Sequence, residues 1–193
     1  KFDNYKINIL SKKGKYDFES SVEVKNNSIT IEELDLNKNK DTYSLVELKG
    51  SYIQNKDIKI ENAIYSEGKN KIAISNLKFS KDYKIKDIDS LELYYLNKNK
   101  NLNFIKLLKN NNNYLLTGEH FDGESLVKKL LDGDSNKSFL KVFKNLNSEI
   151  SINLDKFYSG NQSNLKNVVG KIFVKNSIIK SGKIDALLSD KNK

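Results

Sequence analysis

The chain has no cysteine and no proline, contains one histidine, and takes all 34 of its basic residues from lysine. Without cysteine it can form no disulfide, thiolate metal site or cysteine nucleophile. The single histidine, His120, cannot build a histidine metal cluster, so a zinc site is close to excluded. The sequence also lacks a Gly-rich phosphate loop and a Gly-x-Ser-x-Gly elbow. We therefore expect neither an enzyme nor a protein with a metal or cofactor.

Long hydrophobic runs are missing as well. No apolar stretch approaches the ~20 residues that a membrane-spanning helix needs, and no charged-apolar-small signal pattern is present. Methionine is also absent from the 193 residues. We expect the chain to be a segment of a longer protein.

The absence of arginine bears on the net charge of +9. Nucleic-acid binding usually draws on arginine for bidentate contacts, on aromatic stacking platforms and on basic residues gathered on one face. Here the lysines are spread evenly among 25 acidic residues. This distribution favours solvated surfaces, and we expect no nucleic-acid partner.

What the sequence does contain is a repeated alternation of apolar and polar residues. Short runs such as Tyr5–Ile9, Ile58–Ile60 and Ile150–Leu154 place apolar side chains at every second position. This period of two predicts strands with one face on apolar material and the other in water. Because the connections are short and polar, successive strands are most simply antiparallel neighbours.

The pattern divides the chain into three zones. Strands are predicted over about 2–118 and again over 148–188, with helical structure between them at 122–147. In that middle zone Leu126, Val127, Leu130 and Leu131 form one helical stripe. A second stripe consists of Phe139, Val142, Phe143 and Leu146. The zones are compatible with a barrel, a sandwich or an open curved sheet.

The order of motifs allows a more specific comparison. Residues 115–131 (LLTGEHFDGESLVKKLL) contain a strand, a Gly-x-x-Phe-Asp sequence and a helical stripe that ends in Leu-Leu. An Ile-Ser-Ile-Asn-Leu strand follows at 150–154, then Leu-x-x-Val-x-Gly at 165–170 and Gly-Lys-Ile-Asp-Ala at 182–186. With the strands of 50–91 before them, these segments resemble the AsmA-like bacterial envelope proteins, the group of AsmA, TamB and YhdP, over most of the chain.

The resemblance implies a mainly β fold, a curved antiparallel sheet that forms an open groove and carries one or two short helices. It implies a periplasmic protein, anchored to the inner membrane by a segment outside this chain. Members of that family are implicated in bridge-like transfer of phospholipid between the inner and outer membranes. The expected partners are phospholipid acyl chains and neighbouring segments of the same parent chain, all of 1–193 being one groove segment.

An acyl chain that slides along a groove needs a continuous apolar floor and no hydrogen-bonded pocket. The alternating strands supply candidates for such a floor: Ile7, Ile9, Ile29, Ile31, Ile58, Ile60, Ile72, Ile74, Leu91, Leu93, Ile150, Ile152, Leu154, Ile172 and Val174. The same residues would form an ordinary core in a closed domain. The alternative function is therefore an extracellular or surface β-module, structural or adhesive, with a sealed core.

Overall fold

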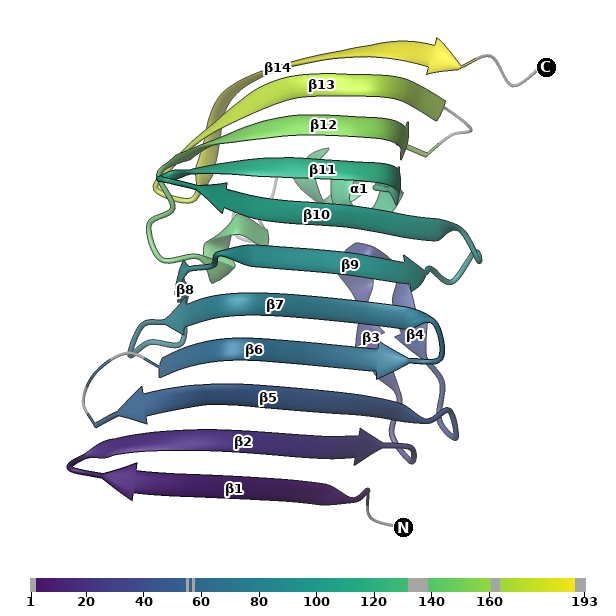
Figure 1. The fold of residues 1–193 in the computed structure, drawn as a ribbon. Helices are drawn as coiled ribbons and strands as arrows, with labels where there is room; N and C mark the ends of the chain where they lie inside the picture. The colour runs from purple at the N-terminus through teal and green to yellow at the C-terminus, as the bar shows by residue number, and fades with distance from the viewer. Residues whose placement is uncertain (1–2, 55, 57, 132–138, 161–163, 190–193) are drawn as a thin grey trace.

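A large curved sheet dominates the computed structural model, which describes residues 3–54, 56, 58–131, 139–160 and 164–189. Figure 1 shows this sheet with a small hairpin and short helical segments on one side. Its 12 strands are β1 (Tyr5–Lys12), β2 (Lys15–Val24), β5 (Ser44–Ile53), β6 (Ile58–Glu67), β7 (Asn70–Phe79), β8 (Ile85–Asp87), β9 (Ser90–Leu96), β10 (Leu102–Asn110), β11 (Asn113–Asp122), β12 (Ser148–Tyr158), β13 (Asn164–Lys175) and β14 (Ile178–Ser189).

The strands follow one another in a mostly antiparallel series, apart from a hairpin near the start and one parallel pair, β11 and β12. After β2 the chain leaves the sheet to form β3 (Ile29–Ile31), the 3-10 helix η1 (Glu32–Leu34) and β4 (Leu36–Lys38). β3 and β4 pair only with each other among the described strands, and β2 pairs directly with β5. The expected placement of Ile29 and Ile31 on the floor of the main sheet is therefore wrong, because both belong to this separate hairpin.

The middle zone forms the crossover between two parallel strands. β11 and β12 run parallel, so the chain must return to the same end of the sheet between them. Helix α1 (Glu124–Leu131) begins this return, as the first predicted stripe indicated. The second stripe was predicted as another amphipathic helix, but it forms only the 3-10 helix η3 (Phe139–Val142). An isolated bridge between Ile85 and Phe143 then ties the segment to β8.

The sheet is open. β1 and β14 stand at its two ends, and in the part of the chain that the structure describes they pair with β2 and β13 alone. The predicted fold class, a curved and mostly antiparallel sheet without closure, is confirmed. The apolar residues of the strands gather on the side that carries the hairpin and α1, which we call the inner face.

Candidate functional site

An uninterrupted row of paired residues crosses the inner face from one edge of the sheet to the other. Register partners share a face of a sheet, so the row can be followed strand by strand. Apart from one serine, its members are aliphatic residues or glycine. The row is Ile7, Ser20, Leu48, Ala63, Ile74, Leu91, Leu107, Leu116, Ile152, Gly170 and Ile184.

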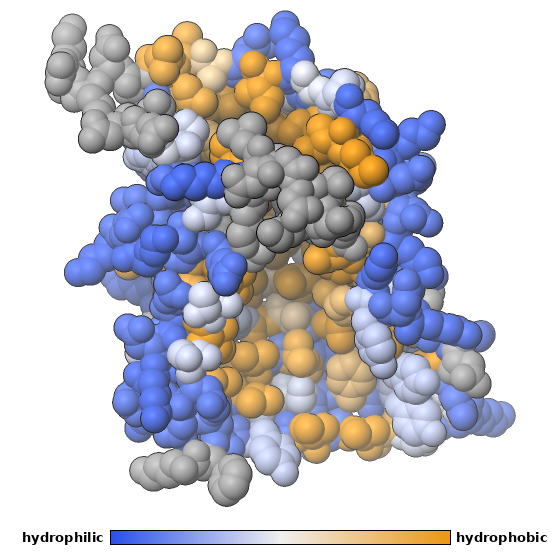
Figure 2. All heavy atoms as spheres, turned by 180° about the vertical axis from the view of Figure 1, so that it is seen from behind, coloured by the Kyte–Doolittle hydropathy of each residue, from blue (hydrophilic) through white to orange (hydrophobic). Residues whose placement is uncertain are grey.

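The neighbouring row, one residue along each strand, lies on the outer face and has a different chemistry. It contains charged partners such as Glu92 and Lys106, whose side chains form an ion pair at 3.7 Å. In Figure 2, which views the inner face, hydrophobic side chains occupy the middle of the molecule between hydrophilic side chains on both sides. The two faces therefore differ as the alternation predicted.

The hairpin of β3 and β4 and the helix α1 together cover the central part of the inner face, and we call them the roof. Leu36 of β4 is 1% exposed and packs in one cluster with Leu93 and Tyr95 of β9. From α1, Leu126 packs against the same cluster. Over the central strands the face is therefore an ordinary protein core.

Beside this roof, an apolar cavity of about 270 Å³ remains open under α1 and the η3 segment. It extends to the edge strand β14, and the described residues that line it are all apolar. The lining consists of Leu116, Phe121, Leu126, Val127, Leu140, Ile150, Ile152, Leu154, Phe157, Leu165, Val168, Ile172, Val174, Ile179 and Ile184.

The two ends of the inner face are bare. In β1, Ile7 is 53% exposed and Ile9 62%, and in β14 Ile184 is 52% exposed. Most large apolar side chains of a soluble domain lose far more of their surface than this. The apolar row thus emerges from beneath the roof at both edges of the sheet.

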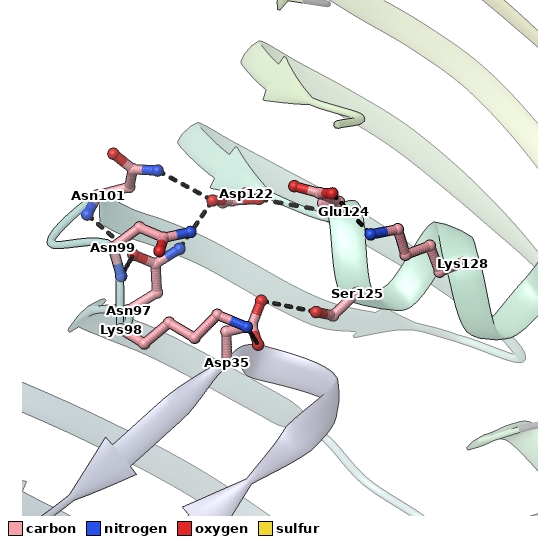
Figure 3. A network of polar contacts seen from close by, with 9 residues as sticks. All are labelled: Asp35, Asn97, Lys98, Asn99, Asn101, Asp122, Glu124, Ser125 and Lys128. Atoms are coloured by element: carbon pink, nitrogen blue, oxygen red, sulfur yellow. Dashed lines mark hydrogen bonds and ion pairs between the residues drawn. The ribbon is translucent and has the colours of Figure 1, made fainter. Parts of the chain in front are cut away.

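The two parts of the roof are joined by one carboxylate, that of Asp35 at the end of η1 (Figure 3). Its Oδ2 accepts a hydrogen bond of 2.6 Å from Ser125 Oγ of α1, and its Oδ1 forms an ion pair of 2.7 Å with Lys98 Nζ. Burial by itself would raise the pKa of Asp35, but the hydrogen bonds from Lys98 and Ser125 outweigh burial and lower that pKa below its ordinary value.

A second carboxylate fixes the start of α1 to the β9–β10 turn. Oδ2 of Asp122 accepts hydrogen bonds from the side-chain amides of Asn97 at 2.7 Å and Asn101 at 3.0 Å. Its Oδ1 accepts a weaker bond of 3.3 Å from the backbone N–H of Glu124, the first residue of α1. Turn, helix and hairpin therefore form one connected polar edge beside the apolar face.

The structure brings most of the predicted floor residues together. Ile29 and Ile31 lie on the hairpin, where Ile31 packs against the core cluster from the roof side. The others share the inner face of the sheet: Ile7, Ile9, Ile58, Ile60, Ile72, Ile74, Leu91, Leu93, Ile150, Ile152, Leu154, Ile172 and Val174.

Sequence reasoning missed several inner-face residues, among them Leu77, Tyr95 and Phe121. Leu77 and Phe121 each follow an irregularity that shifts the alternation by one residue. The first is at Asn76, which has a positive φ of 50° and no register partner in β6, and the second is opposite the shift between Phe104 and Ile105. Gly118 marks the second of them, since a Cβ there would lie 2.4 Å from the carbonyl oxygen of Phe104. This glycine was the available signal for Phe121.

No protein-family model matches the chain, and no curated protein or solved structure matches it significantly. The resemblance to the AsmA-like proteins therefore stays a prediction. Among the residues that the structure describes, there is no group of three or more histidine, aspartate or glutamate side chains that could hold a metal ion. In the same residues, no helix has the length and apolar character to cross a bilayer.

Proposed function

We propose that the chain is a segment of a lipid-carrying groove whose inner face holds the acyl chains of phospholipids. The observation that carries this proposal is the edge-to-edge apolar row, which is exposed at both ends and widens into an apolar cavity beneath α1. A sealed core would leave neither the bare ends nor a cavity that reaches the edge strand.

The energetics suit a path along which a lipid moves. Burial of hydrocarbon is worth roughly 0.8 kcal/mol per CH₂ group. Partial burial of two chains of ~16 carbons would hold a lipid by a gross free energy on the order of 10 kcal/mol, spread over many weak contacts. Because no contact is directional, each can slip to the next position along the parts of the row that the roof leaves uncovered.

The open edges support continuation of the groove into neighbouring segments of the same parent chain. β1 and β14 each have one edge without a partner strand among the described residues. Bare edges with apolar side chains are rare in isolated domains because they promote association. In this proposal the parent is an AsmA-like periplasmic protein, and adjoining strands pair with both edges.

A surface β-module with a sealed core is the second candidate, and the roof is the observation that favours it. Leu36, Leu93 and Tyr95 are as buried as the core of any closed domain. The two proposals differ in whether lipid reaches the apolar cavity beside that core.

Lipid extraction and native mass spectrometry of the purified chain test the proposal. Ile184→Asp introduces a charge at the mouth of the apolar cavity, where the side chain is 52% exposed. The matched control is Val169→Asp, which changes a residue of the outer face that is 47% exposed. Neither variant buries a charge, so both should fold.

We expect the unmodified chain and the Val169→Asp variant to carry phospholipid, and the Ile184→Asp variant to lose most of it. Absence of lipid from all three, after incubation with phospholipid vesicles, would contradict the proposal and favour the sealed module. Equal lipid content in all three folded proteins would contradict binding at this cavity.

A further inference from the structure

A second cavity, of about 460 Å³, lies at the rim of the sheet where β7, β8, the β10–β11 turn and the segment after η3 meet. Unlike the apolar cavity, it has a mixed lining. The lining consists of Lys78, Ile85, Lys86, Asp87, Lys109, Asn112, Tyr114, Phe143, Lys144, Asn145, Leu146 and Asn147.

The polar part of this lining is mainly cationic. Among the described residues it holds four lysines and one carboxylate, that of Asp87, which Lys109 contacts at 2.5 Å and Lys78 at 3.3 Å. Lys144 is also paired at 3.0 Å with Asp82, which lies outside the lining. Asp89 also lies beside Lys109. With Asp82 and Asp89 counted, the four lysines still outnumber the three carboxylates among the described residues, so the cavity favours an anion.

The apolar part of the lining lies next to the apolar cavity. Tyr114 lines the rim cavity, and its register partner Ile150 lines the apolar cavity. On the roof side, the backbone N–H of Phe143 donates a hydrogen bond of 3.0 Å to the carbonyl of Leu140. Phe143 lines the rim cavity and Leu140 the apolar one, so the two cavities are neighbours along both walls.

A cationic cavity beside an apolar cavity matches an amphiphile with an anionic head. Lysine ammonium groups bind phosphate as mobile point charges, without the planar geometry that arginine imposes. We infer that the rim cavity binds the phosphate of a phospholipid head group whose acyl chains enter the neighbouring apolar cavity. This inference rests on the proposed function and adds the head-group chemistry that the groove selects.

The test compares two fluorescent lipids with identical acyl chains, phosphatidic acid and diacylglycerol, in non-ionic detergent below its micelle concentration. Fluorescence polarisation with the full chain gives a dissociation constant for each lipid. The first variant is K86Q/K144Q, which removes two exposed charges from the rim. Its matched control is K49Q/K106Q, which removes two lysines that are ion-paired with glutamates on the outer face.

We expect the unmodified chain to bind phosphatidic acid at least about tenfold more tightly than diacylglycerol, since each lysine near a lipid phosphate contributes on the order of a fivefold gain in affinity. K86Q/K144Q should lose most of that preference, and K49Q/K106Q should keep it. Asp87→Asn removes the lining carboxylate, so it should tighten phosphatidic acid binding about threefold or more. Because the two lipids have identical acyl chains, a gain confined to phosphatidic acid reports on the head group and not on exposed apolar surface.

Equal binding of the two lipids by the unmodified chain would overturn the head-group site and leave the groove intact. Binding of neither lipid would overturn the proposed function and this inference with it. Inorganic phosphate that binds alone as tightly as phosphatidic acid would show a site for free phosphate, and would overturn the assignment to a lipid.

Discussion

Ser125 of α1 donates a hydrogen bond of 2.6 Å to Asp35 of the hairpin, although the two residues are 90 positions apart in the chain. The contact joins the two roof elements that cover the inner face. Since Lys98 of the β9–β10 turn holds the other oxygen of the same carboxylate, one residue ties hairpin, helix and sheet together. These polar contacts add to the apolar packing of Leu36 and Leu126 in one cluster.

Asp35→Asn should destabilise the protein. The amide keeps the shape of the carboxylate but loses its charge and one of its two acceptor oxygens, so we expect the free energy of unfolding to fall by about 1–2 kcal/mol. Urea denaturation measures the change. Asp17→Asn is the control, because its ion pair with Lys15 is half exposed on both sides and should contribute less than about 0.5 kcal/mol. Equal effects of the two substitutions would show that Asp35 does not join the roof.

Acid should destabilise the fold through Asp35 of the roof and Asp87 of β8. Burial opposes ionisation of Asp35 and Asp87, but hydrogen bonds from Lys98 and Ser125 to the first, and from Lys109 and Lys78 to the second, lower both pKa values. A carboxyl whose folded pKa lies below its unfolded value of about 3.9 stabilises the fold above that value. That stability is lost as the pH falls through the unfolded and then the folded pKa.

Thermal unfolding followed between pH 7 and pH 3 tests this expectation. The melting temperature should hold steady down to about pH 5 and then fall. The fall should be shallower in Asp35→Asn, which has one fewer titrating group. A melting temperature that rises on acidification below pH 4 would contradict the assigned direction of both pKa shifts.

Tyr95→Phe should leave the protein as stable or make it more stable. Tyr95 is fully buried, and within the described residues its hydroxyl has no hydrogen-bond partner. An unpaired buried hydroxyl costs about 1–3 kcal/mol, so its removal should stabilise by up to that amount. Tyr65→Phe is the matched control, since the Tyr65 hydroxyl donates a bond of 2.9 Å to Glu67. That variant should lose about 0.5–1.5 kcal/mol, and the reverse order of stabilities would refute the assignment.

The strands, and the residues that share the apolar face of the sheet, could be predicted from the sequence, because a period of two indicates which side of a strand is buried. Ile74 and Ile152 could be assigned to one apolar face by alternation alone. Pairing partners could not be predicted, since nothing local in Ile29–Ile31 distinguishes a hairpin strand from a strand of the main sheet. The hairpin's position as a roof depends on contacts such as Asp35 with Ser125, which are distant in sequence.

The helical zone was predicted in part for a similar reason. Leu126 and its neighbours form an amphipathic stripe with an acidic first turn, and α1 forms there. The stripe of Phe139 and Phe143 has the same spacing, but Phe143 forms a β-bridge with Ile85 of β8, and the 3-10 helix η3 ends before it at Val142. The rim cavity was not predicted at all, because its lysines come from segments between residues 78 and 144 that only the fold brings together.

The central claim, that lipid lies along the inner face, is tested most directly by photo-crosslinking at single positions in the edge strands. A photoreactive residue replaces Ile7, Ile9 or Ile184 on the inner face, or Leu10 or Val169 on the outer face; all five are exposed. With phospholipid vesicles, the account predicts lipid crosslinks at the three inner positions and few at the two outer ones. Crosslinks of equal yield on both faces, or none at the inner positions of a folded protein, would contradict it.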